Sequence, residues 1–183
     1  MKLKTGFAFS LLLTSQLVTA REYIDGHLHY VDFFQETDGM PALLKVMDGS
    51  DITQAVLMGI PVAKTWDKNE PKKPRYYAGD DAPIYWYIGT DLELHAAIEK
   101  LSPEQQKRFI PVLSGFNPDD KKAVNHIRRA LELKPGFWKG IGEVFTRHDD
   151  LTALIHGSAP RANSEAMMKV YKLAAEFDLP VLL

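Results

Sequence analysis

The sequence predicts an α/β fold with parallel strands, and three observations support this expectation. Apolar runs over 53–61 and 109–115 alternate with segments whose apolar residues recur at helical spacing. The composition, 45% hydrophobic and 25% charged, is typical of a globular domain. No glycine-rich phosphate loop follows any strand, which argues against a nucleotide-binding open sheet. Because alternating strands and helices form parallel sheets, two architectures remain: a doubly wound open sheet and an eight-stranded (β/α)8 barrel.

The first half of the chain is expected to contain two strands, each followed by a helix. Residues 22–30 are typical of a short strand, and the continuous apolar run 53–61 predicts a strand buried on both faces. A helix between them is indicated by the apolar stripe Met40, Leu43, Leu44 and Met47. Thr90 and Glu93 have the spacing of a capping box, which predicts a helix over 91–101.

The middle of the chain continues the alternation. Ser102 and Pro103 predict a further helical turn, because they fill its cap and its first position. Residues 109–115 predict a third strand, in which Pro111 is tolerable only near the start. Asn117 and Pro118 are then expected to cap and open another helix.

The last part of the chain adds a fourth strand, a helix and the beginning of a fifth strand. Residues 137–145 predict the fourth strand, and Asn163 or Ser164 is expected to cap the helix. Residues 179–183 are a fifth apolar run. A barrel needs about 250 residues, so the sequence predicts the N-terminal portion of a (β/α)8 barrel, over 21–183 and truncated in strand five. We expect such a piece alone to associate with itself, bind metal weakly and show no turnover.

Residues 1–20 have the three-part pattern of a secretory signal peptide. Lys2 and Lys4 precede an apolar stretch that is too short for a comfortable membrane span. Small and medium residues lead to Ala20, after which we expect cleavage. The mature protein is then periplasmic or secreted, with no stable membrane span, although an uncleaved anchor is the alternative.

Charge and cysteine content exclude several classes of function. The formal net charge is −2, with no basic excess to suggest nucleic-acid binding. The chain has no cysteine, which excludes disulfide scaffolds, thiol nucleophiles and cysteine-ligated metals. We therefore expect a small-molecule substrate, and the sequence leaves homo-oligomerisation open.

Residues 62–90 interrupt the regular spacing between the second strand and its helix. A segment of this length is uncommon without a role of its own. It is rich in aromatic residues, among them Trp86, and it follows a strand, so it is expected on the carboxyl face of a barrel, where active sites lie. The segment is either a lid or wall of a substrate pocket, or a flap packed on a helix or second subunit.

The most informative motif is Asp25-Gly26-His27-Leu28-His29 in the first strand. Residues two apart on a strand point to the same side, so His27 and His29 can reach a single ion. Imidazole is a common ligand of zinc and similar divalent metals. Asp25 shares this face, either orienting a histidine or closing the barrel floor as a polar residue.

These residues resemble the amidohydrolase superfamily. The resemblance rests on Ile24-Asp25-Gly26-His27-Leu28-His29, the segment after strand two, and Lys139-Gly140-Ile141-Gly142-Glu143-Val144. It is closest to the amidohydrolase-related proteins that include decarboxylases of the aminocarboxymuconate semialdehyde type. It covers residues 21–183, as the first half of such a barrel.

The resemblance implies a distorted barrel with one or two divalent metal ions, zinc being the first expectation. His27 and His29 would be the first ligands, and Glu143 falls where strand four contributes a further ligand in some members. The alternative for Glu143 is a structural carboxylate paired with Arg147 or a lysine. The remaining histidines and the aspartate that handles the proton would lie beyond Leu183, so no catalytic residue is assigned here.

The other histidines carry weaker signals. His148 directly follows the fourth strand, and with Trp86 it is a candidate substrate-binding residue, although a surface loop is the alternative. His95 and His126 fall within helices and are expected on solvated faces. Ser114 has no nucleophile-elbow glycines around it, which disfavours a serine hydrolase.

The sequence therefore predicts an exported metal-dependent hydrolase. It would attack a small amide, lactone or ester with a metal-activated water. The alternatives are a metal-dependent decarboxylase of the same fold and a barrel that binds metal or a partner without turnover.

Overall fold

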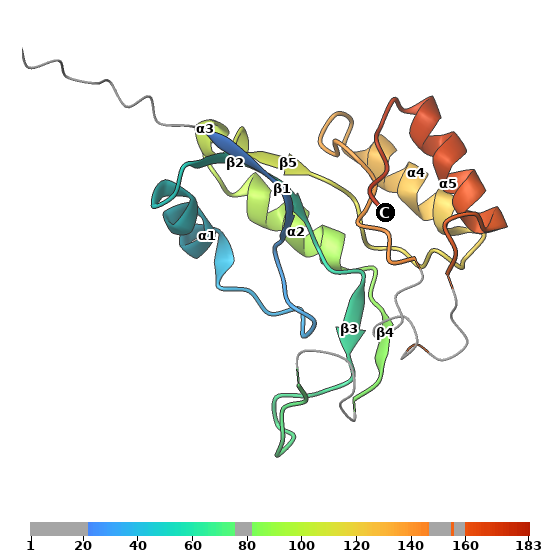
Figure 1. Cartoon of the computed structure of the whole chain (residues 1–183), viewed down its shortest axis with the longest axis horizontal. Helices are drawn as coiled ribbons and strands as arrows, with labels where there is room; N and C mark the ends of the chain where they lie inside the picture. Colours follow the sequence, from blue (N-terminus) through green and yellow to red (C-terminus); the bar gives the residue numbers. More distant parts are fainter. Residues whose placement is uncertain (1–21, 76–81, 147–154, 156–159) are drawn as a thin grey trace, which may run out of the picture.

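The computed structural model describes residues 22–75, 82–146, 155 and 160–183. Its central element is a parallel three-stranded sheet in the order β1-β2-β5, formed by β1 (Tyr23–His29), β2 (Ile52–Met58) and β5 (Phe109–Pro111) (Figure 1). The predicted α/β class with parallel strands is confirmed by this sheet. Apolar side chains fill β2, where Ala55 and Leu57 are fully buried.

Two further extended segments continue the sheet through single bridges. Leu113 pairs with Ile141, and Ile141 pairs with Val181, both in parallel. Ile141 also donates its N–H to the Pro180 carbonyl at 3.0 Å and accepts from Leu182 at 2.9 Å. Within the described residues, β1, β2, β5 and the segments at Ile141 and Val181 therefore lie side by side in the same order as in the sequence.

A regular strand was expected over 137–145, and this prediction is wrong for most of the segment. The strand pairing there is limited to the bridge at Ile141 and the hydrogen bonds around it. Gly142 has φ +134, a value that residues with a side chain rarely adopt, and this breaks the regular ladder just before Glu143. The barrel itself stays a prediction, because the described residues form one curved part of a sheet.

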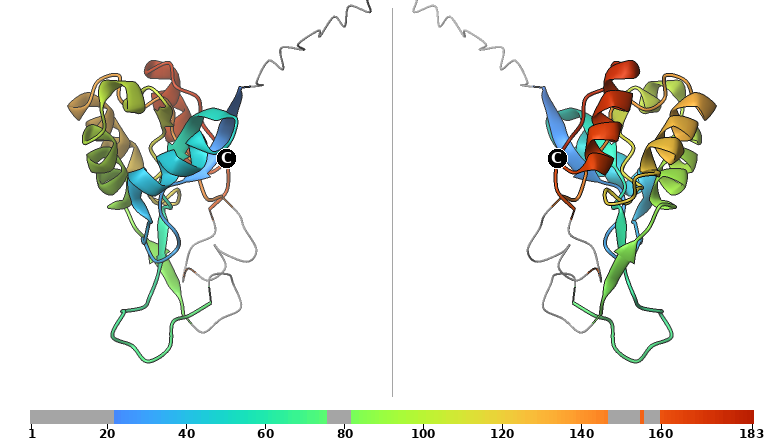
Figure 2. Two further views of the ribbon diagram at one scale, coloured as in Figure 1. Left: turned by 90° about the vertical axis from the view of Figure 1, so that its left-hand side faces the viewer. Right: turned by 90° about the vertical axis from the view of Figure 1, so that its right-hand side faces the viewer.

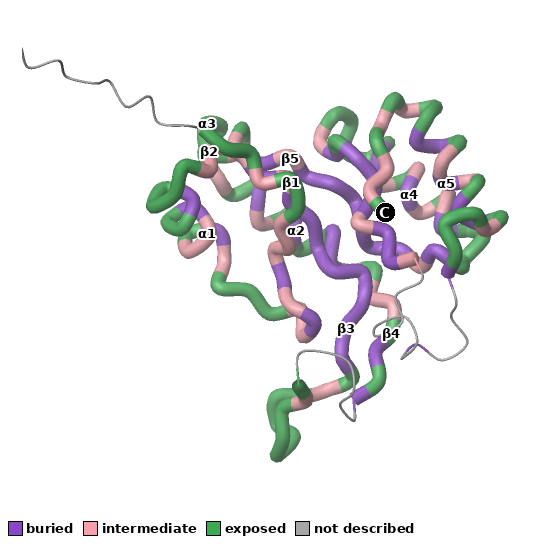
Figure 3. Tube along the Cα trace, in the orientation of Figure 1, coloured by how far each residue is buried: buried purple, intermediate pink, exposed green. Residues whose placement is uncertain are grey.

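Helices cover one side of these strands (Figure 2). They are α1 (Gly39–Asp48), α2 (Thr90–Glu99), the single turn α3 (Pro103–Gln106), α4 (Ala123–Leu133) and α5 (Glu165–Glu176). The apolar side chains of α1, α4 and α5 face the sheet and form the main core with β2 and β5, and those of α1 include the predicted stripe residues Met40, Leu44 and Met47. The buried trace runs through β2 and β5, whereas β1 is largely exposed or half-buried (Figure 3).

Two predicted helix starts are confirmed. The Ser102 hydroxyl accepts a hydrogen bond from the Gln105 N–H, and the Gln105 side chain returns to the Ser102 N–H, as in a capping box. Ser164 caps α5 by accepting from the N–H of Met167. Each of these caps depends on residues within one turn of sequence, which explains why the pattern is informative.

Two other predicted caps are wrong. Helix α2 begins at Thr90 itself, with Gly89 at its cap position, and the Thr90 hydroxyl accepts from the Ile60 N–H at 3.2 Å. Helix α4 begins only at Ala123, because Asn117 forms a local turn in which its side chain accepts from the N–H of Asp119. In both cases the polar side chain has another partner.

Part of the 62–90 insertion is an antiparallel hairpin, with β3 (Val62–Lys64) paired to β4 (Ile84–Trp86). It projects beyond the carboxyl ends of the sheet strands (Figure 1). The register sets Val62 opposite Trp86 and Lys64 opposite Ile84. The insertion therefore has secondary structure of its own, which the sequence analysis did not predict.

The predicted third strand ends early, and Pro111 lies at its end. The Pro111 carbonyl accepts from the Lys139 N–H at 2.7 Å, so its ring nitrogen faces the same neighbouring segment. This segment pairs only through the bridge at Ile141, so the missing donor of proline interrupts no regular ladder. The next residue, Val112, again faces β2, because its N–H donates to the Leu57 carbonyl at 3.0 Å.

A buried polar cluster attaches helix α2 to the ends of β2 and β5. The Asp91 carboxylate accepts from the backbone N–H groups of Ser114 at 3.0 Å and Gly115 at 2.8 Å. The Ser114 hydroxyl donates to the Gly59 carbonyl at 3.1 Å. Ser114 thus takes part in this cluster through both its backbone N–H and its hydroxyl.

The predicted signal peptide, residues 1–20, lies outside the described residues. Among the described helices, none is long and apolar enough to cross a bilayer.

The Asp91 cluster predicts a pH dependence of stability. Burial raises the pKa of Asp91 from 3.8 to about 7, although the Ser114 and Gly115 N–H groups act in the opposite direction. The folded protein therefore binds more protons than the unfolded chain between these two values, and the contribution of Asp91 to stability is lost as the pH rises through them. We expect the unfolding free energy of the natural protein, relative to that of Asp91→Asn, to fall between pH 4 and pH 7.5. Urea unfolding of both proteins across this range measures it, and parallel pH profiles would contradict it.

Candidate metal centre

The end of β1 contains a bulge that directs the two histidines. Asp25 pairs with Ala55 and Leu28 with Leu57, so β1 has one residue more than β2 over this stretch. The Asp25 carboxylate accepts from the backbone N–H of His27 at 3.0 Å. Asp25 therefore supports the backbone of the bulge, and the expectation that it orients a histidine ring is not met by this hydrogen bond.

Glu143 reaches the same place from a segment three positions along the sheet from β1. Its backbone N–H donates to the Met58 sulfur at 3.3 Å. Met58 ends β2, is fully buried, and is the register partner of His29. Its carbonyl also accepts from the Tyr30 N–H at 2.8 Å. Met58 thus contacts both segments that carry candidate ligands.

The three candidate ligands meet at three single atoms. His27 Nε2 and His29 Nε2 lie 3.2 Å apart, and Glu143 Oε2 lies 3.3 Å from the first and 3.1 Å from the second. The structure therefore brings together the three residues predicted from the sequence to bind metal. We call this group the ligand triangle.

Protons alone cannot satisfy all three contacts of the ligand triangle. Each Nε2 carries at most one hydrogen, and an ionised carboxylate carries none. Two hydrogens cannot make three hydrogen bonds, so at least one pair of atoms is left facing each other as two acceptors or as two donors. A cation in the triangle removes this conflict, because all three atoms then direct a lone pair at it.

The dimensions of the ligand triangle suit a first-row divalent ion. In a tetrahedral zinc site with bonds of roughly 2.0–2.1 Å, the donor atoms lie about 3.3 Å apart. The observed separations of 3.1–3.3 Å are close to this value. The chemistry also fits, since zinc accepts imidazole nitrogen and carboxylate oxygen. The ligand triangle therefore passes the test of distance and of donor type.

The charge of Glu143 suits the same role. Burial opposes its ionisation, but hydrogen bonds and positive charge from His29 and His27 outweigh burial and hold the pKa of the carboxyl below 4.5. Glu143 is therefore an anion at neutral pH. The described contacts of Glu143 are with His27, His29 and Met58. Arg147, the partner that the alternative interpretation requires, lies outside the described residues.

The ligand triangle is open to solvent on one side. The His27 side chain is 51% exposed, whereas those of His29 and Glu143 are each 26% exposed. Structural zinc sites are closed by four protein ligands, while catalytic sites keep a position for water or substrate. Among the described residues, three candidate ligands with one exposed member leave room for a further ligand, water or substrate.

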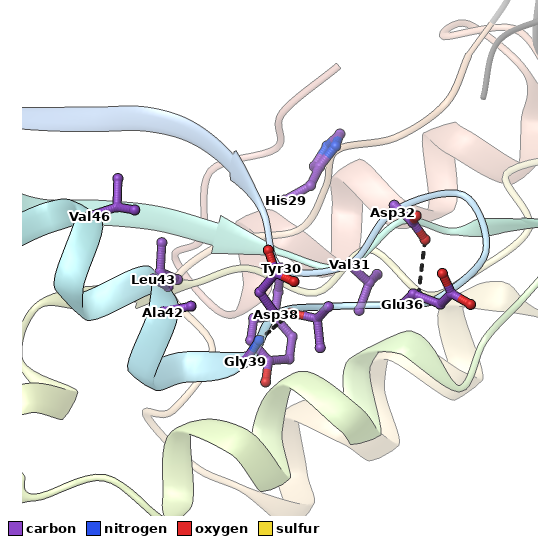
Figure 4. A pocket seen from close by; sticks show the side chains of 11 residues that line it. His29, Tyr30, Val31, Asp32, Glu36, Asp38, Gly39, Ala42, Leu43 and Val46 are labelled. Atoms are coloured by element: carbon purple, nitrogen blue, oxygen red, sulfur yellow. Dashed lines mark hydrogen bonds between the residues drawn. The ribbon is translucent and has the colours of Figure 1, made fainter.

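A groove of about 380 Å³ lies between the end of β1, its following loop and helix α1 (Figure 4). Its carboxylates are partly engaged: Asp32 accepts from the N–H groups of Phe34 and Glu36, and Glu36 pairs with Lys73 at 2.8 Å. The ring of His29 points away from Leu43 and Val46 on the helix side (Figure 4). The groove therefore lies next to the ligand triangle, and its carboxylates Asp32 and Glu36 bind groups of the loop and Lys73.

The predicted substrate-binding residues remain predictions. Trp86 ends β4 and packs against a second apolar cluster, and its buried indole nitrogen has no hydrogen-bond partner among the described residues. A donor without a partner suits contact with a small molecule, but no described contact links it to the ligand triangle. His148 lies outside the described residues.

Two helical histidines are more buried than the sequence suggested. The His95 ring packs edge-on against Phe137 at 4.6 Å, and its side chain is 15% exposed. Burial lowers the pKa of His95 and also that of half-buried His126, where Arg129 adds repulsion. The expectation of fully solvated faces is therefore wrong for both. Neither ring belongs to the ligand triangle.

The comparisons with known proteins add nothing to this geometry. No protein-family model, curated protein or solved structure matches the chain.

The role of Met58 leads to a prediction about stability. Met58→Leu keeps an apolar side chain of similar size but removes the sulfur that accepts the Glu143 N–H. We expect this variant to lose about 1 kcal/mol more stability than Met167→Leu, the cost of an unpaired N–H. Met167 is a matched control because it is also fully buried and lies in the main core. Urea unfolding gives both values, and equal losses would show that the sulfur contact contributes nothing.

Proposed function

We propose that this protein is a metal-dependent hydrolase of amidohydrolase type, in which His27, His29 and Glu143 bind a divalent cation. The observation that carries the proposal is the convergence of three ligand atoms within 3.1–3.3 Å on the open rim of a parallel sheet. The chemistry that a divalent cation supplies at such a site is polarisation of a carbonyl and a lower pKa for water. Small amides, lactones and esters are the substrate class that this chemistry serves.

The position of the ligand triangle supports the proposal. His29 ends β1, and Glu143 follows the bridge at Ile141, so both lie at the carboxyl ends of parallel segments. Active sites of (β/α)8 barrels lie at this end. The strand order also supports a barrel over a doubly wound sheet, because a doubly wound sheet reverses its order at the ligand site.

The three candidate ligands would have different roles, because their charge and their exposure to solvent differ. Glu143 supplies the negative charge that offsets part of the charge of a dication. His29, less exposed and in contact with Glu143 at 3.1 Å, forms the inner side of the site. His27 is half exposed, so a substrate would approach on its side.

We propose export to the periplasm or medium on the basis of the sequence pattern in residues 1–20.

A metal titration tests the ligand assignment. Protein treated with EDTA is titrated with zinc sulfate in a calorimeter, and we expect one ion per chain. His29→Ala should weaken binding by at least about 100-fold, beyond the 10–100-fold typical of residues that only support a ligand. His126→Ala is the matched control, since this half-buried histidine lies in helix α4, outside the ligand triangle.

The titration has clear adverse outcomes. Unchanged affinity in His29→Ala, or equal loss in His126→Ala, would overturn the assignment. Two histidines and one carboxylate also suit Fe(II), so a preference for Fe(II) over zinc would argue for oxidative chemistry. With metal bound in the protein expressed from its full reading frame, acid release from a simple lactone supports a hydrolase. Release of carbon dioxide from a carboxylic acid would instead indicate a decarboxylase.

A further inference from the structure

We propose that the β3–β4 hairpin positions the metal ligands by holding together the segments that leave β1 and the Glu143 segment. The proposal rests on the metal site proposed above and assigns the 62–90 insertion a supporting role. The hairpin does so through a second apolar cluster, separate from the main core, which we call the rim cluster. Its buried members are Val31, Phe33, Ile60, Val62, Ile84, Phe145 and Ile155.

The rim cluster reaches both ligand segments within two residues of the ligands. Val31 follows His29 by two positions and is 4% exposed, and Phe145 follows Glu143 by two positions and is 7% exposed. Both belong to the cluster that contains Val62 of β3. An apolar contact at this distance along the chain restricts where each ligand backbone can lie.

The hairpin supplies the middle of the rim cluster. Val62 is fully buried in β3, and Ile84 of the paired strand β4 is 4% exposed. Tyr85, between Ile84 and Trp86, is 47% exposed and points the other way. One face of the hairpin therefore packs on the rim cluster, and Tyr85 lies on the opposite face together with its partner Ala63, which is 3% exposed.

Hydrogen bonds fix the hairpin to the loop that follows β1. The Gln35 side-chain amide donates to the carbonyls of Ile60 at 3.0 Å and Val62 at 2.9 Å. The Lys64 N–H donates to the Phe33 carbonyl at 2.8 Å. With these bonds at its base, the hairpin moves with the β1 loop.

The next part of the insertion is attached to the same loop. The Lys73 ammonium lies 4.2 Å from the centre of the Phe34 ring and 5.2 Å from that of Trp66, whose ring meets Phe34 edge-on. Lys73 also pairs with Glu36 at 2.8 Å. These contacts attach the insertion to the loop that follows β1 at a second place.

The sheet alone does not hold the ligand triangle in place. Three strand spacings separate β1 from the Glu143 segment, which is about 14 Å on a flat sheet. Glu143 itself follows the last bridge, at Ile141. Metal sites need their ligands placed to within about 0.5 Å, so the packing beyond the sheet ends must supply the remaining precision.

A pair of matched isoleucine variants tests the proposal. Ile84 lies in the rim cluster and is 4% exposed, while Ile98 of helix α2 lies in the main core and is 3% exposed. Changing either to alanine removes the same atoms from a buried site and lowers stability. We expect zinc affinity to fall about 10-fold in Ile84→Ala, as for other residues that support ligands, and less than 2-fold in Ile98→Ala. Circular dichroism confirms that both are folded at the titration temperature.

A spectroscopic measurement adds a readout that general destabilisation does not move. Co²⁺ replaces zinc, and the intensity of its visible bands reports the geometry of its ligands. We expect these bands to change in Ile84→Ala and to stay as in the natural protein in Ile98→Ala. If either alanine variant does not fold, Ile84→Val and Ile98→Val replace the pair. We then expect zinc affinity to fall about 2–3-fold in Ile84→Val and to stay unchanged in Ile98→Val.

The outcomes separate this inference from the proposed function. If the natural protein binds zinc through His29 but Ile84→Ala and Ile98→Ala behave alike, the positioning role is overturned and the metal site stands. If the natural protein binds no zinc, or His29→Ala binds it equally well, the proposed function fails and the inference fails with it.

Discussion

The contact between the His29 imidazole and the Glu143 carboxylate is the constraint on which the rest of the structure depends. These groups come from segments separated by β2 and β5, yet their atoms lie 3.1 Å apart. A flat sheet would hold the two backbones about 14 Å apart. The sheet, together with the chain that follows the bridge at Ile141, must therefore bend toward the ligand triangle, and the Glu143 N–H lies 3.3 Å from the Met58 sulfur of β2.

The curvature depends on close packing at the ends of the strands. The Asp91 carboxylate joins the end of β5 to the beginning of α2 through two backbone N–H groups. Gly115 permits this approach, because a Cβ at that position would lie 2.7 Å from the Asp91 oxygen. This contact holds the beginning of α2 against the chain that follows β5.

Local patterns in the sequence predicted much of this architecture. The apolar stripe of α1, the caps at Ser102 and Ser164, and the apolar runs of the strands are all patterns within a few residues of sequence. Where the prediction failed, a distant partner was responsible. Thr90 is not a helix cap, because its hydroxyl bonds the Ile60 N–H thirty residues away. The hairpin was missed because its strands are only three residues long.

The candidate site shows the same division between local and distant causes. His27 and His29 could be predicted because two positions of one strand bring them together, although the bulge that aims them leaves no simple sequence pattern. Glu143 could be proposed only through a family resemblance, since nothing near it in sequence identifies a ligand. Met58 left no signal at all, because its role depends on a backbone N–H 85 residues away.

The three ligands are therefore held by different means, and this difference matters for binding. His29 and Glu143 lie next to the rim cluster, which fixes the chain two residues beyond each of them. His27 lies in the bulge, is 51% exposed, and depends mainly on the Asp25 carboxylate for its backbone position. Two ligands held by tertiary packing define where a cation can sit, and the third can adjust to it from the solvent side. In the proposed site, a small molecule would then approach the cation from the side of His27, the most exposed of the three candidate ligands.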